Sequence, residues 1–215
     1  MKCIELMCGA SVILLLGHGA QADFIGVTVD EFDAGLPDGT TYRIYANFNN
    51  PLDVLLAIGG IPGLQPVSFN SPSPLLNDPW AGGSIKEDFP GKGEPWDSWV
   101  TIDFHPTTHT MCETPEDCPA IAGTHFEADD GGWFNADPGS PAQGTSLVIA
   151  QFSFSDDGPA GTASLEGLVN WVPAGGGPGF ESTPFLVEWQ LIPAPGALAL
   201  LMLPQCLTPR RRRAS

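Results

Sequence analysis

The sequence has few basic residues: eight Lys and Arg stand against 25 Asp and Glu in 215 residues, for a net charge of −17. Five of the eight lie near the ends, at Lys2 and at positions 210–213, so residues 23–192 carry three basic and 24 acidic residues, a net charge of −21. A surface this acidic repels the phosphate backbone and offers no basic patch to release counterions. The composition therefore excludes nucleic acid as a partner and favours cations as ligands.

The sequence also lacks the short motifs that commonly mark catalytic and nucleotide-binding sites. It contains no Gly-x-Ser-x-Gly nucleophile elbow, no paired-histidine zinc motif, no phosphate loop and no dinucleotide fingerprint. Two carboxylates about 5 to 9 Å apart would suffice for glycoside hydrolysis, but nothing in the sequence selects one pair among the acids. We therefore expect a protein that is not an enzyme, and we keep an acid-pair glycosidase as a third hypothesis behind the two given below.

A helical hydrophobic period is missing as well, whereas alternation of apolar and polar residues is frequent. Glycine and proline number 26 and 22, without a three-residue period, and they demand many turns. Strands are predicted at 25–29, 41–48, 53–58, 66–69, 99–104, 125–128, 147–154, 163–171 and 184–192. We expect 70–96 and the rest of 105–144 to be mostly irregular. The pattern predicts one all-β domain over 23–192, an antiparallel β-sandwich with a jelly-roll variant equally allowed.

The N-terminal segment has the features of a secretory signal peptide. Lys2 supplies a positive charge, 10–16 is apolar, and Ala20-Gln21-Ala22 has the small-x-small form of a signal peptidase site. Cleavage after Ala22 would remove residues 1–22 and leave Asp23 first. A buried N-terminal helix is the alternative, and Glu5 is the residue that favours it.

Three features follow one another in the C-terminal segment, residues 193–215. They are a proline elbow, a short apolar run at 197–203 and an arginine block; the elbow consists of Pro193, Ala194 and Pro195, and the block of Arg210, Arg211, Arg212 and Arg213. The run is shorter than the roughly 20 residues that span a bilayer as a helix. Arginines beside an apolar segment stay on the cytoplasmic side, so the tail would insert with its C-terminus inside. An ordinary basic terminus is the alternative.

This order of features resembles the PEP-CTERM sorting signal of exported bacterial proteins. Ala194 stands where the commonest motif has Glu, and Pro204-Gln205 interrupts the hydrophobic stretch. The resemblance implies export, transient retention at the inner membrane and processing by an exosortase-type enzyme, with delivery to the cell surface or the extracellular matrix.

The domain itself resembles an uncharacterised group of exported PEP-CTERM-type proteins of planctomycete-like bacteria. The stretches that carry this resemblance are 40–48, 96–102 and 131–134. The group assigns no catalytic or binding residue, so it implies an exported context and no site.

Two of the five cysteines, Cys112 and Cys118, lie between the two terminal segments. In an exported chain such a pair, flanking one acidic loop, predicts a disulfide. The alternative is a zinc site that would add His105, His109 and His125 to the two thiolates.

Calcium is the favoured candidate cofactor, because hard cations take oxygen ligands from acidic loops. Asp129, Asp130, Asp156 and Asp157 lie beside turn residues and are the candidate ligands. The alternative is that these aspartates form turns and face solvent.

Four tryptophans fall in or beside predicted loops: Trp80, Trp96, Trp99 and Trp133. Their rings could stack on sugars or fill the core, and core packing is the favoured use. Our leading hypothesis is therefore a noncatalytic exported protein of the cell surface or matrix. A secreted carbohydrate-binding module, with extracellular polysaccharide as its partner, is the second hypothesis.

Overall fold

The computed structural model describes residues 23–77, 94–104, 107–112, 121–175 and 179–192. Within these ranges the regular structure is all strand, and no helix is long and apolar enough to cross a membrane. Several predicted features lie outside them: the signal peptide with Ala20 and Ala22, the whole segment 193–215, Cys118, His105 and Trp80.

The strands form two antiparallel sheets, which we call sheet A and sheet B. Sheet A has four strands in the order β1-β2-β10-β5. Their bounds are β1 Phe24–Phe32, β2 Gly39–Phe48, β10 Ser146–Ser155 and β5 Trp99–Val100. The connection from β1 to β2 ends at Asp38, which takes the left-handed backbone conformation at φ 55°.

Sheet B has eight strands, with β6-β8-β3-β11-β4-β7 as its main path; β12 pairs with β11 and β9 with β3. Their bounds are β3 Val54–Gly59, β4 Val67–Leu75, β6 Thr108–Cys112, β7 Gly123–Ala128, β8 Gly131–Asn135, β9 Ala142–Gln143, β11 Gly161–Val172 and β12 Glu181–Leu191. One edge of β11 carries β12 along its length, and the other is shared by β3 and β4.

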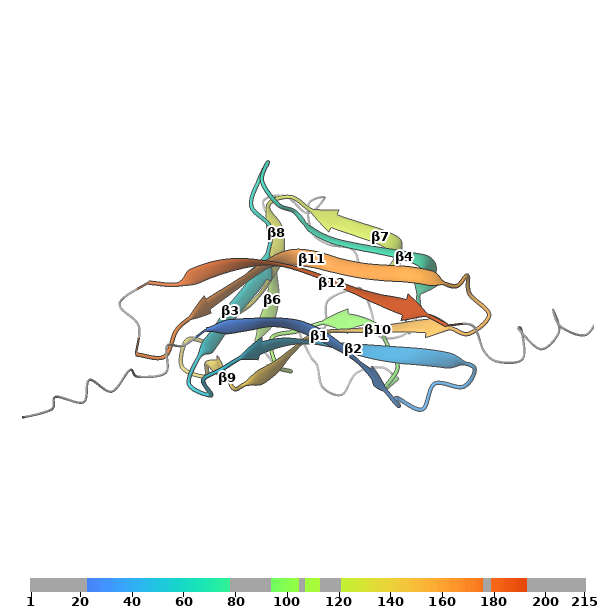
Figure 1. The fold of residues 1–215 in the computed structure, drawn as a ribbon, viewed down its shortest axis with the longest axis horizontal. Coiled ribbons are helices and arrows are strands. Elements are labelled where there is room, and N and C mark those ends of the chain that lie inside the picture. The colour runs from blue at the N-terminus through green and yellow to red at the C-terminus, as the bar shows by residue number, and fades with distance from the viewer. Residues whose placement is uncertain (1–22, 78–93, 105–106, 113–120, 176–178, 193–215) are drawn as a thin grey trace, which may run out of the picture.

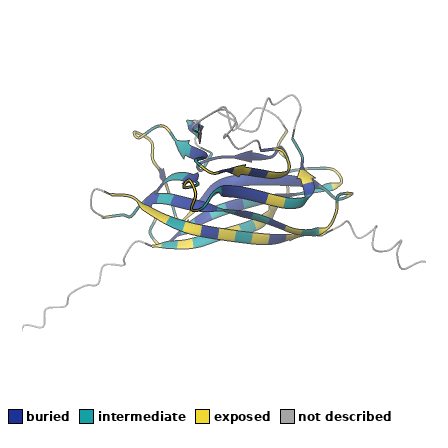
Figure 2. Cartoon of the chain, turned by 90° about the horizontal axis from the view of Figure 1, so that it is seen from above, coloured by how far each residue is buried: buried dark blue, intermediate teal, exposed yellow. Residues whose placement is uncertain are grey.

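The two sheets pack face to face as layers (Figure 1), and strands of both sheets contribute buried residues (Figure 2) to one hydrophobic core. Alternate residues of β2 (Ile44, Ala46, Phe48) and of β11 (Ala163, Leu165, Val169) supply much of this core, as their alternation predicts. The predicted class, an antiparallel β-sandwich, is therefore confirmed.

Strand β10 is buried on both faces, because residues 94–104 cover the outer side of sheet A. Gln151 is fully buried there; its Nε2 donates to the carbonyls of Pro95 and Asp97 at 2.8 and 2.9 Å. The Oγ of Ser98 accepts from the backbone N–H of Ser153 at 3.0 Å. Polar side chains thus tie this covering segment to the sheet.

The prediction that 105–144 is mostly irregular was wrong, because β6, β8 and β9 lie in it beside β7. Strand β8 pairs with β3 at Gly59↔Gly132, and a Cβ at Gly132 would lie 2.1 Å from the carbonyl oxygen of Ile58. Because neither Gly59 nor Gly132 has a side chain, the two backbones can approach closely. In the sequence each of them belongs to a pair of adjacent glycines, which sequence rules associate with a turn.

Two other strand ends also differ from the prediction. Strand β4 continues to Leu75 through Pro72 and Pro74, and its pairing with β7 skips from Asn70 to Leu75, so the prolines fall where no ladder donor is needed. Strand β5 ends at Val100, although the backbone N–H groups of Thr101 and Asp103 still donate to β10; Asp103 and Phe104 then take φ values of 50° and 57°.

Candidate functional site

The predicted calcium ligands fall into two pairs in separate turns. Asp129 and Asp130 connect β7 to β8, next to the start of β4, where Ala128 pairs with Val67. Asp156 and Asp157 connect β10 to β11. Among the residues that the structure describes, no group of three or more His, Cys, Asp and Glu side chains is arranged to hold a metal ion. Neither pair therefore gains a further carboxylate or imidazole ligand there.

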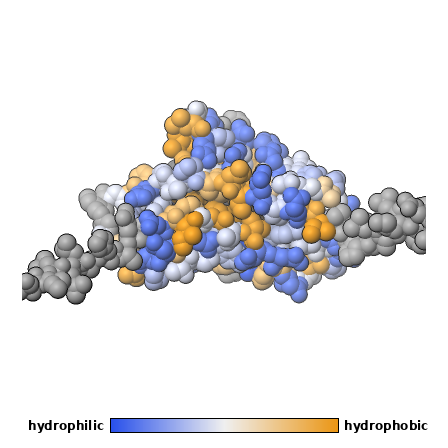
Figure 3. Space-filling model, viewed as in Figure 1, coloured by the Kyte–Doolittle hydropathy of each residue, from blue (hydrophilic) through white to orange (hydrophobic). Residues whose placement is uncertain are grey.

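Asp129 has a structural partner instead. Its Oδ1 accepts from the backbone N–H of Gly63 at 3.0 Å, which holds the loop between β3 and β4 in place. That loop presents an apolar tip, with Leu64 80% and Ile61 39% exposed, at the top of the molecule in Figure 3. The bond matches the alternative in which these aspartates serve turns and loops.

The histidines of the alternative zinc site are kept apart. His109 lies on β6 and His125 on β7, which are the two ends of the main strand path of sheet B. His109 packs near Phe134, and a ring nitrogen of His125 lies 2.9 Å from Oδ1 of Asn70. The separation removes the proposed combination of His109 with His125.

Trp99 and Trp133 do not form a surface for stacking on sugars, which was the alternative to core packing. Both are fully buried, and Trp96 is partly buried. The Nε1–H of Trp133 donates to the carbonyl of Thr101 at 3.1 Å, and the ring of Trp99 meets that of Phe104 edge-on at 5.4 Å. Packing is therefore the use of these two rings, as favoured from the sequence.

The outer side of sheet B presents two rows of mainly polar side chains across four neighbouring strands, which we call the polar face. The strand register gives one row as His125, Asn70, Ser164 and Glu188, and the other as Glu127, Ser68, Glu166 and Leu186; of these Ser68 is buried. Neighbouring members of a row lie about 4.8 Å apart along the sheet. Side chains on one face of neighbouring strands can therefore contact one extended ligand together.

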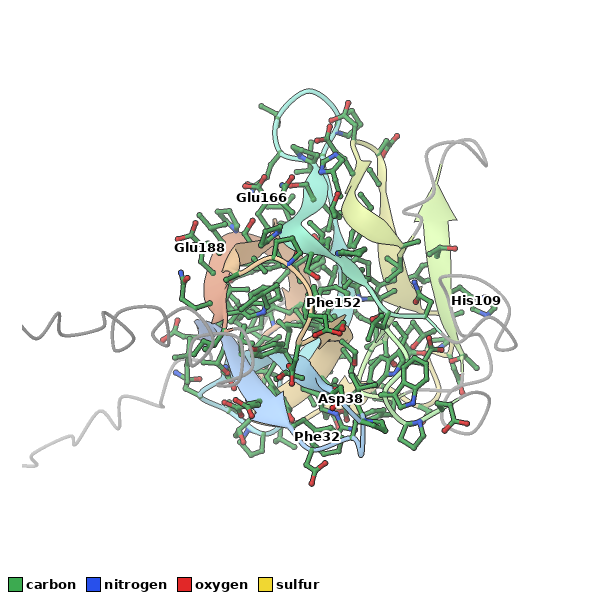
Figure 4. The ribbon with its side chains drawn as sticks, turned by 90° about the vertical axis from the view of Figure 1, so that its right-hand side faces the viewer. Phe32, Asp38, His109, Phe152, Glu166 and Glu188 are labelled. Atoms are coloured by element: carbon green, nitrogen blue, oxygen red, sulfur yellow. The ribbon has the colours of Figure 1, made fainter. Side chains whose placement is uncertain are left out.

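Hydrogen bonds between neighbouring strands order part of the polar face. The Oγ of Ser68 donates to Oε1 of Glu166 at 2.7 Å. Glu188 is exposed and Glu166 partly exposed, and Figure 4 shows both on the same outer side of the sheet. No Lys or Arg among the described residues lies on this face, so it is an acidic surface of oxygen and nitrogen groups.

Arg43 is the one Lys or Arg in the described ranges, and it is held by protein groups. Its guanidinium carbon lies 3.3 Å from the centre of the Phe32 ring and 5.3 Å from that of Phe104, and its Nε donates to Gln151 at 3.0 Å. Burial lowers the pKa of Arg43, and Tyr45 opposes that shift. The residue therefore fastens the cover of sheet A to β2.

A small cavity lies where β12 ends, next to the turn between β10 and β11. Its lining includes Thr40, Tyr42, Ser73, Asp156 and Leu191, and the space open to the centre of a water molecule is about 10 Å³. The Tyr42 hydroxyl donates to the carbonyl of Gln190 at 3.3 Å, which joins β2 of one sheet to β12 of the other. The cavity thus lies at the point where the chain leaves the sandwich for the C-terminal segment.

Sequence reasoning missed both the polar face and this cavity. Alternation along 163–171 and 184–192 could have identified the outward positions, but which of them are neighbours depends on strand pairing. The cavity combines residues of four distant segments, and no local pattern signals it.

Comparisons with known proteins give no family: no family model, no curated protein and no solved structure matches this chain. The fold and the surfaces described above are therefore the observations from which a function can be argued.

Proposed function

We propose that this is a noncatalytic exported protein whose β-sandwich is delivered to the cell surface or the extracellular matrix by its C-terminal segment. The described strands begin at Phe24 and end at Leu191, so the two predicted targeting segments flank the sandwich. An exosortase-type enzyme would be the processing partner, and contact with the inner membrane would be transient.

The observation that carries the proposal is the position of the two ends of the sandwich. The backbone carbonyl of Asp23 accepts a hydrogen bond from the N–H of Asn49, just after the end of β2. Leu191 and Ile192 instead line the cavity together with Thr40, which lies at the start of β2. The ends therefore lie at opposite extremes of the long axis (Figure 1). A domain held by its C-terminal segment would present its far end, with the acidic sides of the sandwich free in solution.

The charge distribution supports the same arrangement. The net charge of −21 on 23–192 favours a soluble body kept away from an anionic membrane, whereas arginines 210–213 favour the inner leaflet by about 1 kcal/mol each. Opposite charges on body and tail would hold the tail at the membrane and the body away from it.

The test is to replace Arg210, Arg211, Arg212 and Arg213 with Ser and to follow a tagged chain by cell fractionation. We expect full-length protein in the medium or unprocessed in the periplasm, whereas the wild type is retained and processed. A chain with Lys86→Ser and Lys92→Ser, which removes positive charge upstream of the tail, is the control and should behave as wild type. Identical size and location of the arginine variant and the wild type would refute the sorting proposal.

Mass spectrometry of both ends of the mature protein adds an independent measurement. We expect Asp23 as the first residue and a C-terminus within 193–215 after processing. A mature chain that retains residues 1–22 would refute export through a cleaved signal peptide.

The second candidate is a carbohydrate-binding module, and the polar face supports it. Carboxylate, amide and hydroxyl groups in two rows could hydrogen-bond the hydroxyls of an extracellular polysaccharide, and Leu186, 62% exposed, could contact an apolar sugar face. Binding to a glycan array by wild type and by Glu166→Gln/Glu188→Gln would test this candidate. Glu31→Gln/Asp33→Asn, with the same change in charge on sheet A and the adjoining loop, is the matched control. Equal binding by both double variants would exclude the polar face.

A further inference from the structure

The connection between β1 and β2 forms a hollow, which we call the turn pocket. The space in it that is open to the centre of a water molecule is about 420 Å³, within the range of about 300 to 1,000 Å³ that small-molecule sites occupy. All of its lining residues lie within 31–41. The lining includes Glu31, Phe32, Asp33, Ala34, Leu36 and Thr40.

The shape of the turn pocket depends on a glycine at the start of β2. A Cβ at Gly39 would lie 2.3 Å from Cδ2 of Leu36, so the missing side chain leaves room for Leu36 there. Oδ1 of Asp33 accepts from the backbone N–H two residues further on at 2.9 Å, and the carbonyl of Asp38 accepts from the N–H of Asp156 at 3.0 Å. The protein's own hydrogen bonds therefore order the connection, and the pocket is preformed.

Apolar side chains form part of the lining. Phe32, Ala34 and Leu36 are each partly buried. The ring of Phe32 is held in place by Arg43, whose guanidinium carbon lies 3.3 Å from the ring centre. A fixed aromatic ring beside aliphatic groups favours a ligand that has an apolar part.

The charge of the lining is negative. Glu31 and Asp33 are exposed carboxylates, whereas Arg43, the one Lys or Arg in the described ranges, is not a lining residue and donates to Gln151. Burial raises the pKa of Tyr42, which follows Thr41 on β2, and the negative charge of Glu31 adds to this shift. The lining therefore combines apolar groups with two negative charges, and among the described residues it has no positive one.

The other polar side chains of the lining are already engaged. The hydroxyl of Thr40 donates to Oδ1 of Asp156 at 3.2 Å, and the hydroxyl of Thr41 lies 2.7 Å from that of Ser153. A neutral sugar, which needs several donors and acceptors, would therefore find few in the pocket. A calcium ion would need six to eight oxygen ligands, more than two carboxylates supply.

We propose that the turn pocket binds a small organic amine in its charged form, with the ammonium group at Glu31 and Asp33 and the apolar part against Phe32 and Leu36. Opposite charges attract the ammonium group, and removal of the apolar part from water adds to the affinity. A hollow formed by one hairpin connection fits a small molecule, whereas a protein partner would need about 800 Å² of surface.

The turn pocket is separate from the polar face. Figure 4 shows Phe32 and Asp38 on the side of sheet A, away from Glu166 and Glu188. Neutral glycans are not ligands of this pocket, so Glu31→Gln/Asp33→Asn should leave glycan binding unchanged. The inference does not depend on the proposed function.

Isothermal titration calorimetry of the full chain with 2-phenylethylammonium tests the role of the carboxylates. We expect a Kd on the order of 1 mM for wild type. Glu31→Gln/Asp33→Asn should bind about tenfold more weakly, because two charged contacts at an exposed site are lost. Asp137→Asn/Glu181→Gln removes the same charge elsewhere on the surface, and this matched control should bind as wild type does. Equal affinities of the two double variants would overturn the proposal.

Further probes separate the contributions of charge and apolar surface. 2-Phenylethanol keeps the ring without the charge, and methylammonium keeps the charge without the ring; each should bind at least about tenfold more weakly than 2-phenylethylammonium. Equal binding of the alcohol would reject recognition of charge. Nα-acetyl-lysine methylamide carries its ammonium group on a peptide, and tighter binding of this probe would reject a small amine in favour of a protein side chain.

NMR of the ¹⁵N-labelled wild-type chain locates the site without any variant. On titration with 2-phenylethylammonium, the backbone amide signals of Gly35, Gly39 and Thr40 should shift most. Shifts confined to other parts of the chain, such as the exposed loop tip at Leu64, would overturn the assignment to the turn pocket.

Discussion

Trp133 and Trp189 both lie in the core and differ in one hydrogen bond. The indole N–H of Trp133 donates to the carbonyl of Thr101, whereas the buried N–H of Trp189 has no hydrogen-bond partner among the described groups. The two residues are 0% and 8% exposed, so phenylalanine removes a similar buried volume at each.

The pair gives a prediction about a single hydrogen bond. Trp133→Phe should destabilise the protein by about 1 to 2 kcal/mol more than Trp189→Phe, because only the first leaves a buried carbonyl without its donor. Chemical denaturation of both variants measures the difference. Equal losses would show that the Trp133 bond contributes nothing beyond ring packing.

Tyr42 gives a prediction about alkaline pH. Burial first, and then Glu31 and Asp156, raise its pKa above the ordinary value of about 10. Above that value the unfolded chain has released a proton that the folded chain still holds, so stability falls as the pH rises through the folded pKa. We expect wild type to lose stability relative to Tyr42→Phe above about pH 10 and the difference to be constant below it.

The tyrosine titration is easy to assign, because the sequence has only two tyrosines. In a Tyr45→Phe background the ultraviolet titration of tyrosinate reports Tyr42 alone. A midpoint at or below that of free tyrosine would contradict the raised pKa.

At the scale of elements, the pairing of β3 with β8 depends on glycine. A Cβ at Gly132 would meet the backbone of Ile58 and Gly59 at 2.1 and 2.6 Å, and backbone atoms cannot yield as a side chain can. Gly132→Ala should therefore cost about 3 kcal/mol or loosen the β6–β8 pair. Gly179→Ala is the matched control, because a Cβ there has no neighbour within 4 Å. Similar stabilities of the two variants in thermal denaturation would contradict this account.

The end of β6 carries the second element-scale prediction. Cys112 is the last residue of β6, paired with Gly131, and Cys118 lies outside the described residues, so the disulfide stays a prediction. Closing so short a loop stabilises by about 2 kcal/mol in the chain-entropy model. The mature protein should have an intact mass lower by two hydrogen atoms than its reduced form, and an unchanged mass on reduction would exclude the bridge.

At the scale of the whole molecule, the acidic body predicts a response to cations. Calcium at about 10⁻⁴ to 10⁻³ M should raise the melting temperature if the aspartate turns bind it weakly, as extracellular modules do. Magnesium at equal ionic strength is the control, since screening of a net charge of −21 would stabilise with either ion. Equal shifts in melting temperature for calcium and magnesium would exclude a specific calcium site.

The separation of the two aspartate pairs allows the response to be assigned. Asp129→Asn/Asp130→Asn and Asp156→Asn/Asp157→Asn change one turn each. The first turn lies beside the start of β4, whereas the second follows the end of β10. A calcium-specific shift that survives in one variant and disappears in the other would identify the binding turn. Loss of half the shift in each would point to the general field of the body.

The sequence by itself determined the all-β class and much of the core. Period-two alternation at 41–48 and 163–171 is a local property, and it assigns Ile44, Phe48, Leu165 and Val169 to the inward face without knowledge of the neighbouring strand. Composition likewise determined that the body is strongly acidic, because charge needs no fold to be counted.

Only the tertiary structure decided which segments meet. Gly59 and Gly132 look like turn signals and instead allow two backbones to touch. Asp129 gains a bond to the β3–β4 loop, and Ser73 meets the β10–β11 turn across the sandwich. Each of these outcomes depends on pairing between residues far apart in the chain. Strand register and sheet packing set such distances, and the local sequence does not encode them.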